Sequence, residues 1–148
     1  MTPLNLLRAL QSELSQDLAN YRLSSEGSEN KKIDVYLQLS NEQFNDESRY
    51  PLILLSLLRV TDHELDSRRV GMSVAQIEFT VGVYGEEPET YWDLLNILET
   101  MRLRLIRRPL IAGKFRLIYP IETEILETMP YPYYFGYMHA SFNIGRPF

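Results

Sequence analysis

The chain has 148 residues, of which 45% are hydrophobic and 24% charged, and these values are typical of a globular protein with one domain over residues 1–148. Cysteine is absent and the formal net charge is -5, which excludes a disulfide framework and a thiolate metal site and argues against a surface that wraps nucleic acid. Polar residues interrupt the first leucines and no basic segment precedes them, so we expect neither a signal peptide nor a membrane span.

An amphipathic helix is predicted for residues 3–22. Thr2 and Pro3 are typical of an N-cap and a first helical position. Leucines at positions 4, 7, 10, 14 and 18 then recur on one face of a helical period. The stretch 24–30 is polar and rich in turn formers, which predicts that the helix has ended and a linker follows.

Three strands are predicted next. Aliphatic side chains occupy every second position in residues 33–39, which indicates a strand buried on one face. The polar stretch 40–50 is predicted as a loop. Residues 52–60 are almost continuously apolar, which favours a strand covered on both faces over a short helix, because Pro51 precedes them. Alternation is clearest in residues 70–84.

A charged connection, residues 61–69, separates the second and third strands. It is longer than the roughly two to five residues of an ordinary hairpin loop. We therefore expect these residues to project as a long charged β-hairpin arm. The arm contains Asp62, His63, Glu64, Asp66, Arg68 and Arg69.

A second amphipathic helix is predicted for residues 89–107, which ends in arginines suited to a helix C-terminus just before Pro109. Its apolar arc is wider than contact with one core requires. We therefore expect the outer flank to pack against another subunit. The candidates for this packing are Trp92, Leu103 and Ile106.

The last part of the chain reads as short strands over residues 114–119, 121–126 and 135–144, with a proline-rich segment before the last of them. The element order is therefore α-β-β-β-α-β-β(-β). Strands in runs, with helices between the runs, predict an α+β domain in which both helices pack on one face of a mostly antiparallel sheet.

Tyrosines gather at the proline-rich segment, where Tyr131, Tyr133 and Tyr134 precede Phe135 and Tyr137. Tyrosine is enriched in interface hot spots, which favours a contact surface. A core-lining strand with its entry loop explains the same pattern equally well, and both interpretations stay open. Stacking on single-stranded nucleic acid lacks the basic residues that it needs.

The two histidines, His63 and His139, have no metal-ligand or catalytic spacing around them. Carboxylates beside His63 could join it in binding a cation, but charged loops of this kind are mostly solvated surface. His139 alternates with apolar residues in a predicted strand, which favours a sheet or interface residue over a general base. We expect no catalytic residue, no cofactor, no metal site and no enzymatic activity.

Four segments together resemble a known family. They are YPLILL at 50–55, IEFTVGVY at 77–84, YWDLLNIL at 91–98 and MPYPYYFG at 129–136, and the last two are the most specific. Their order and spacing are similar to the tail terminator, or tail completion, proteins of siphophages and related prophages of Gram-positive hosts. The likeness covers residues 33–146.

The resemblance implies a virion structural protein at the neck. In that family an α+β subunit forms a ring, usually a hexamer, that caps the tail tube and offers its other face to the head connector. The implied partners are copies of the chain, the tail tube protein and the head connector or completion protein, while DNA passes through the lumen without specific binding and no membrane is involved. The implied location is the head–tail junction of the virion, after assembly in the host cytoplasm. The resemblance also implies that the arm at 62–69 and the segment 131–134 contact neighbouring subunits or the tube; the arm candidates are Asp62, His63, Glu64, Asp66, Arg68 and Arg69.

Other functions stay open. A head completion or connector protein of the phage neck has the same size and acidity. A small α+β enzyme or ligand-binding domain would need one deep cavity containing His139 or His63. An adaptor acting as a monomer or dimer would carry one hydrophobic patch, whereas a ring subunit carries two different complementary ones.

Overall fold

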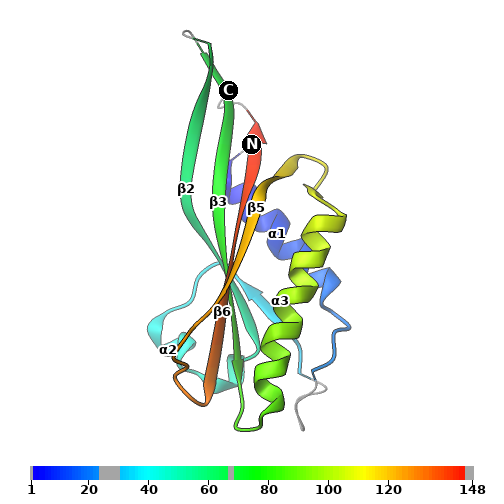
Figure 1. Cartoon of the computed structure of the whole chain (residues 1–148), viewed down its shortest axis with the longest axis vertical. Coiled ribbons are helices and arrows are strands. Elements are labelled where there is room, and N and C mark those ends of the chain that lie inside the picture. The colour runs from blue at the N-terminus through cyan, green and yellow to red at the C-terminus, as the bar shows by residue number, and fades with distance from the viewer. Residues whose placement is uncertain (1, 24–30, 67–68, 146–148) are drawn as a thin grey trace.

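The computed structural model describes residues 2–23, 31–66 and 69–145, and these form an α+β fold around one mostly antiparallel, curled sheet (Figure 1). The six strands have the order β1-β2-β3-β6-β5-β4, and only the pairing of β1 with β2 is parallel. The helical elements of this described part are α1 (Pro3–Asp17), α2 (Asn41–Phe44), α3 (Glu89–Arg107) and the short 3-10 turn η1 (Glu47–Arg49). The strands are β1 (Asp34–Tyr36), β2 (Leu52–Asp66), β3 (Arg69–Tyr84), β4 (Leu110–Ile111), β5 (Phe115–Ile125) and β6 (Tyr133–Gly145).

The N-terminal helix begins where the sequence predicts it. The Thr2 side chain accepts a hydrogen bond from the Asn5 backbone N–H at 3.1 Å, which is the N-cap contact. The helix ends at Asp17, five residues before the predicted end, although Leu18 is still buried beyond it. The predicted linker at 24–30 lies outside the described residues.

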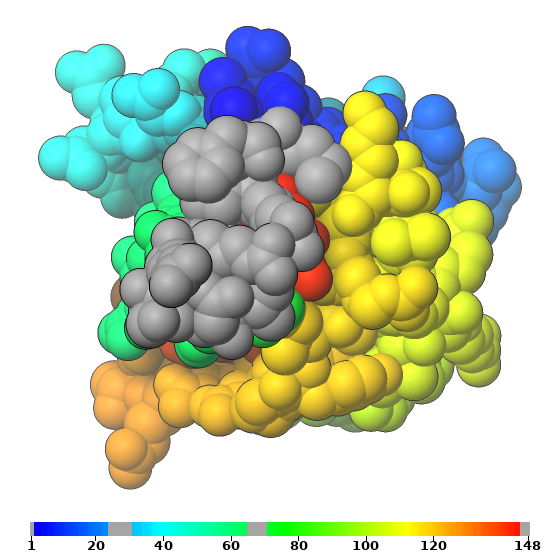
Figure 2. All heavy atoms as spheres, turned by 90° about the horizontal axis from the view of Figure 1, so that it is seen from above, coloured from blue at the N-terminus to red at the C-terminus, as the bar shows by residue number. Residues whose placement is uncertain are grey.

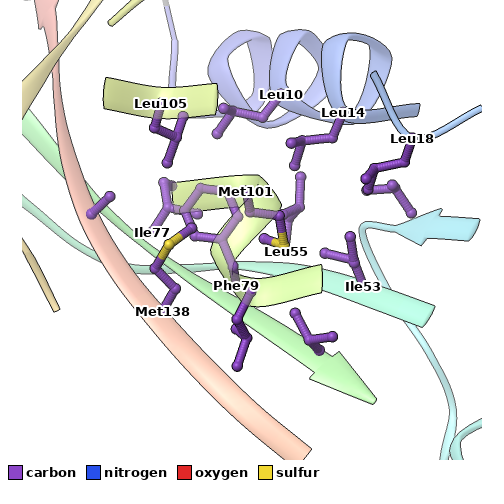
Figure 3. Close-up of a cluster of buried hydrophobic side chains, with 14 of the residues drawn as sticks. Leu10, Leu14, Leu18, Ile53, Leu55, Ile77, Phe79, Met101, Leu105 and Met138 are labelled. Carbon is purple, nitrogen blue, oxygen red and sulfur yellow. The ribbon is translucent and has the colours of Figure 1, made fainter. Parts of the chain in front are cut away.

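The main core lies between the sheet and the two long helices. Side chains from α1 and α3 converge there on the helix side of β2, β3 and β6 (Figure 3). Each fully buried leucine or phenylalanine contributes about 1.5–3 kcal/mol relative to an exposed one. The side chains at the centre are Leu10, Leu14, Leu18, Ile53, Leu55, Ile77, Phe79, Met101, Leu105 and Met138.

A second, aromatic cluster lies on the other face of the sheet. Tyr50, Leu52 and Phe135 are its buried members, and Phe44 packs on them with its ring stacked 5.5 Å from that of Phe135. The segment predicted as a loop at 40–50 forms this cover. It contains α2, whose N-terminus is a capping box between Ser40 and Gln43, so local sequence chemistry gives this segment its helical turn.

Two predicted boundaries were wrong. Residues 61–66 continue β2 instead of forming a connection, and β3 begins at Arg69, so the two strands rise together past the helices (Figure 1). The predicted strands 114–119 and 121–126 are one strand, β5. Its register against β6 shifts between Ile118 and Glu122, a stretch that contains Pro120, and proline is tolerated in a strand at such an edge bulge.

Candidate assembly surfaces

The outer edge of β2 is open over most of its length. β1 pairs with β2 only from Leu52 to Leu54. Beyond that point Leu57, Leu58 and Val60 are each between 40% and 44% exposed. The prediction that 52–60 is covered on both faces is therefore wrong for its second half, where these three side chains are exposed.

The opposite edge of the sheet is also open. β4 pairs with β5 only at Phe115 and Arg116, so the rest of β5 has a described partner strand, β6, on one side only. Tyr119 is exposed on this edge. The cross-strand pairs place Glu122 beside His139 on the face of the sheet that the long helices leave uncovered.

A groove of about 460 Å³ runs between α3 and this free edge of β5. Leu98 and Ile125 form part of its apolar lining, and the exposed ion pair between Glu99 and Arg102 lies at its rim, with the charged atoms 2.6 Å apart. The Arg102 guanidinium holds the pKa of the Glu99 carboxyl below its ordinary value. The residues around the groove are Leu95, Asn96, Leu98, Glu99, Arg102, Thr123 and Ile125.

The outer flank of α3 is only partly as predicted. Trp92 is 55% exposed, and Ile106 is exposed on the same helix. Leu103 is half-buried and instead lines a second groove of about 380 Å³, beside Asp17 and Arg104. The exposed apolar stripe consists of Tyr91, Trp92, Leu95 and Ile106.

The β2–β3 hairpin holds the predicted arm residues in strand pairing. Asp62 accepts a hydrogen bond from the Ser73 hydroxyl at 2.6 Å, and His63 lies opposite Met72 in the register. Asp62, His63 and Glu64 are exposed. Arg68 and the side chains of Asp66 and Arg69 lie outside the described residues. Within the described part of the chain no three His, Asp or Glu residues are grouped to hold a metal ion.

The tyrosines of the proline-rich segment fit both interpretations, because one is exposed as a contact surface requires and the others pack within the molecule. Tyr131 is 63% exposed, which suits a contact surface. Tyr133 belongs to the aromatic cluster, where its ring lies 5.1 Å from that of Tyr50 and its hydroxyl donates to the Asn45 carbonyl at 3.0 Å. Tyr134 packs beside α3, with its ring 6.2 Å from that of Tyr91.

His139 lies on the helix-free face of the sheet, which is the face opposite the long helices α1 and α3 and is covered in part by the segment 40–50. Its Nε2 atom is 2.9 Å from a carboxylate oxygen of Glu78, and both side chains are partly exposed. Neither of the two grooves includes a histidine. This contact therefore sits on an open sheet surface and not in one of these hollows.

No family model matches the chain, and no curated protein matches its sequence. None of the described helices has the length and apolar character needed to cross a membrane. The function of the chain is therefore inferred from its surfaces. The two open edges and the groove were not predicted from the sequence. Pro120, between two predicted strands, was the available signal for the edge at β5, because proline within a sheet is confined to edges and bulges.

Proposed function

We propose that the chain is a structural subunit that assembles into a closed ring, and that this ring caps a phage tail tube and joins it to the head connector. One observation carries the proposal: exposed apolar side chains lie at two unlike places, the outer edge of β2 and the flank of α3 beside β5. Seen along the long axis, β2 and the end of α3 lie on opposite sides of the molecule (Figure 2).

Ring symmetry explains why two unlike surfaces matter. In a ring, each subunit uses one patch toward the preceding copy and a different patch toward the following copy. A twofold dimer uses the same patch on both copies, and an adaptor needs only one patch. Trp92 and Tyr131, as exposed aromatics, are the residue types that most often dominate interface energy.

The fold class supports the same proposal. The chain runs α1, β1, α2, η1, β2, β3, α3, β4, β5 and β6. What supports the proposal is the coarse arrangement, an α+β domain with one mostly antiparallel sheet. We assign the charged end of the β2–β3 hairpin, residues 61–69, to contact with the tail tube or a neighbouring subunit. Asp62, His63 and Glu64 are the described residues that would make this contact.

The helix-free face of the sheet is the proposed lining of the lumen. Glu78 and Glu122 lie on this face on either side of His139, and Glu124 lies opposite Tyr137. Arg59 and Arg116 lie on the same face, so the three carboxylates exceed the guanidinium groups there by one. Carboxylates repel the phosphates of DNA, so such a lining lets DNA pass without binding it. Carboxylates also cannot replace the cations condensed on DNA, so they provide no counterion release that would favour binding.

The first test is the mass in solution. Light scattering across a concentration series, with negative-stain imaging of the large species, should give a closed ring of six 17.4 kDa subunits with a central opening. A monomer at every concentration, or a compact dimer, would contradict the ring.

A second test addresses the place of the ring in the virion. Gold-labelled antibody raised against the chain should bind intact phage particles at the junction of head and tail. Labelling along the tail tube, or at the distal end, would contradict the cap even if the isolated protein forms rings.

A further inference from the structure

We infer that neighbouring copies join by strand pairing, with the outer edge of β2 in one copy added to the free edge of β5 in the next, over the groove beside α3. This inference rests on the proposed ring and names the surfaces that hold it together. The occupant of the groove is thus a second copy of this chain.

Strand direction permits this contact without turning a subunit over. β2 is antiparallel to β3, β3 to β6, and β6 to β5, so β2 and β5 of one subunit point in opposite directions. When a second copy is related by rotation about an axis that runs along the strands, its β2 therefore meets β5 as an antiparallel neighbour. The sheet then continues from one copy to the next with the helices on the same side.

The helix side of the added strand fits the groove. Leu57 pairs with Ile77 and Val60 with Ala75, and both partners point to the buried helix side of β3. Cross-strand partners share a face of the sheet. In the added strand, Leu57 and Val60 would therefore point into the groove, which is lined by Leu95, Leu98 and Ile125.

The other side of the added strand is complementary in charge. Arg59 pairs with Gln76, so its side chain lies on the helix-free face. Glu122 and Glu124 lie on the helix-free face of β5, and both are exposed. The contact thus brings a guanidinium to two carboxylates on one side of the strand while aliphatic side chains are buried on the other side.

The two free edges are short, which limits pairing with chains other than the neighbouring subunit. β1 pairs with β2 as far as Leu54, so the free edge of β2 begins near Leu55. The bulge around Pro120 divides β5, and its longer regular stretch without a β4 partner runs from Glu122 to Ile125. Exposed edges are templates for pairing with other chains, and bulges and prolines restrict such pairing. Each contact uses β2 of one copy and β5 of the other. An open row of subunits therefore keeps a free β2 edge at one end and a free β5 edge at the other until the ring closes.

Disulfide trapping tests the pairing directly, because the chain has no cysteine of its own. Arg59→Cys is mixed with a tagged form carrying Glu122→Cys or Glu124→Cys, and the mixture is mildly oxidised. We expect a mixed dimer with at least one of the two partners and little dimer from any variant alone. The matched control is Arg8→Cys, at an exposed position on α1, which should give no mixed dimer with Glu122→Cys.

Charge reversal supplies an independent measurement. Arg59→Glu should raise the subunit dissociation constant at least roughly tenfold, because like charges would then face each other across the contact. Combining it with Glu122→Arg and Glu124→Arg should restore assembly. Circular dichroism and a thermal melt of each variant establish that the subunits are folded.

The outcomes separate this inference from the proposed ring. If wild-type rings form while no mixed disulfide appears and Arg59→Glu assembles normally, edge pairing is wrong and the ring stands. If the mixed disulfide forms but imaging shows open chains, edge pairing stands and the cap is wrong. If the wild-type chain is monomeric and no mixed disulfide forms, both are overturned.

Discussion

Arg104 of α3 donates from its Nε atom to the carboxylate of Asp17 at the end of α1, which ties the two long helices together. The Arg104 side chain is only 9% exposed, and its Nη2 atom also donates to Glu13. The other oxygen of Glu13 accepts from the backbone N–H of Ala112 at 2.7 Å. One guanidinium thus links α1 and α3, and through Glu13 it also reaches the turn before β5.

Loss of this guanidinium should destabilise the fold. Arg104→Ala leaves the partly buried Glu13 carboxylate without its cation, and Asp17 keeps only its contact with the exposed Arg108 side chain. We expect a loss of about 2 kcal/mol in the free energy of unfolding. Urea denaturation of the monomer measures it. Arg102→Ala, which removes only the exposed pair with Glu99, should cost less than about 0.5 kcal/mol. Equal losses in the two variants would contradict the structural role of Arg104.

Two glycines should respond differently to an added methyl group. A Cβ at Gly82 would lie 2.6 Å from Cε2 of Tyr50 and 2.9 Å from Cε1 of Phe135, so the rings of the aromatic cluster would have to shift. A Cβ at Gly136 would meet Cδ1 of Leu98 at 2.6 Å, which is the mobile end of a flexible side chain. We expect Gly82→Ala to cost about 1–3 kcal/mol and Gly136→Ala clearly less.

Thermal melts of the two glycine variants at matched concentration give the comparison. If Gly136→Ala were the more damaging variant, the packing between α3 and β6 would be tighter than the aromatic cluster. That result would contradict the rigid packing that we assign to Tyr50 and Phe135.

Trp92 is the only tryptophan of the chain and should report assembly by its fluorescence. It is 55% exposed, so its emission in the monomer should be that of a solvated indole. Ring formation through the α3 flank should move the emission to shorter wavelengths and reduce quenching by acrylamide. Assembly with an unchanged emission would exclude Trp92 from the interface.

The variant Trp92→Ala separates assembly from folding. Because the side chain is largely exposed, its removal should change monomer stability by less than about 0.5 kcal/mol. It should weaken assembly by roughly tenfold or more, as expected of an aromatic hot spot. Light scattering and a thermal melt measure the two effects separately, and a loss of stability equal to the loss of assembly would contradict the assignment.

Alkaline pH should unfold the protein through its tyrosines. Burial raises the pKa of the Tyr50 hydroxyl. A hydrogen bond with Glu47, followed by partial burial, raises the pKa of Tyr84 from 10.0 to about 12. Because the folded state favours the neutral phenol, this stability is complete below pH 10 and is lost as the pH rises toward about 12.

This decrease of stability with rising pH can be checked by following phenolate absorbance and urea midpoints together across the same pH range. The free energy of unfolding should fall as phenolate appears, and Tyr84→Phe should reduce the slope. Complete ionisation of the tyrosines near pH 10 without any loss of stability would contradict these assignments.

Long periodic segments could be predicted from the sequence. The helix predicted at 89–107 is α3 with the same bounds, and the strand predicted at 70–84 is β3 with one more residue. Their side-chain periods are repeated over many residues, so local pattern alone defines them. Short or irregular elements were missed, because β4 has only two residues and β5 continues through Pro120 at a bulge.

The contact candidates could be predicted only in part. Trp92, Ile106 and Tyr131 are exposed as a contact surface requires, whereas Tyr133 fills the aromatic cluster and Leu103 lines a groove toward α1. Alternation in a strand predicts that neighbours point to opposite faces. It does not predict which of those faces another part of the chain covers.

The long helices and strands and the apolar side of each followed from the order of residues, because these properties depend on residues close together in the chain. Only the tertiary structure decided that Leu57, Leu58 and Val60 lie on an open edge and that β5 borders a groove beside α3. The physical reason is that an edge is defined by strand pairing between distant residues: β1 is too short to cover β2, and β4 is too short to cover β5.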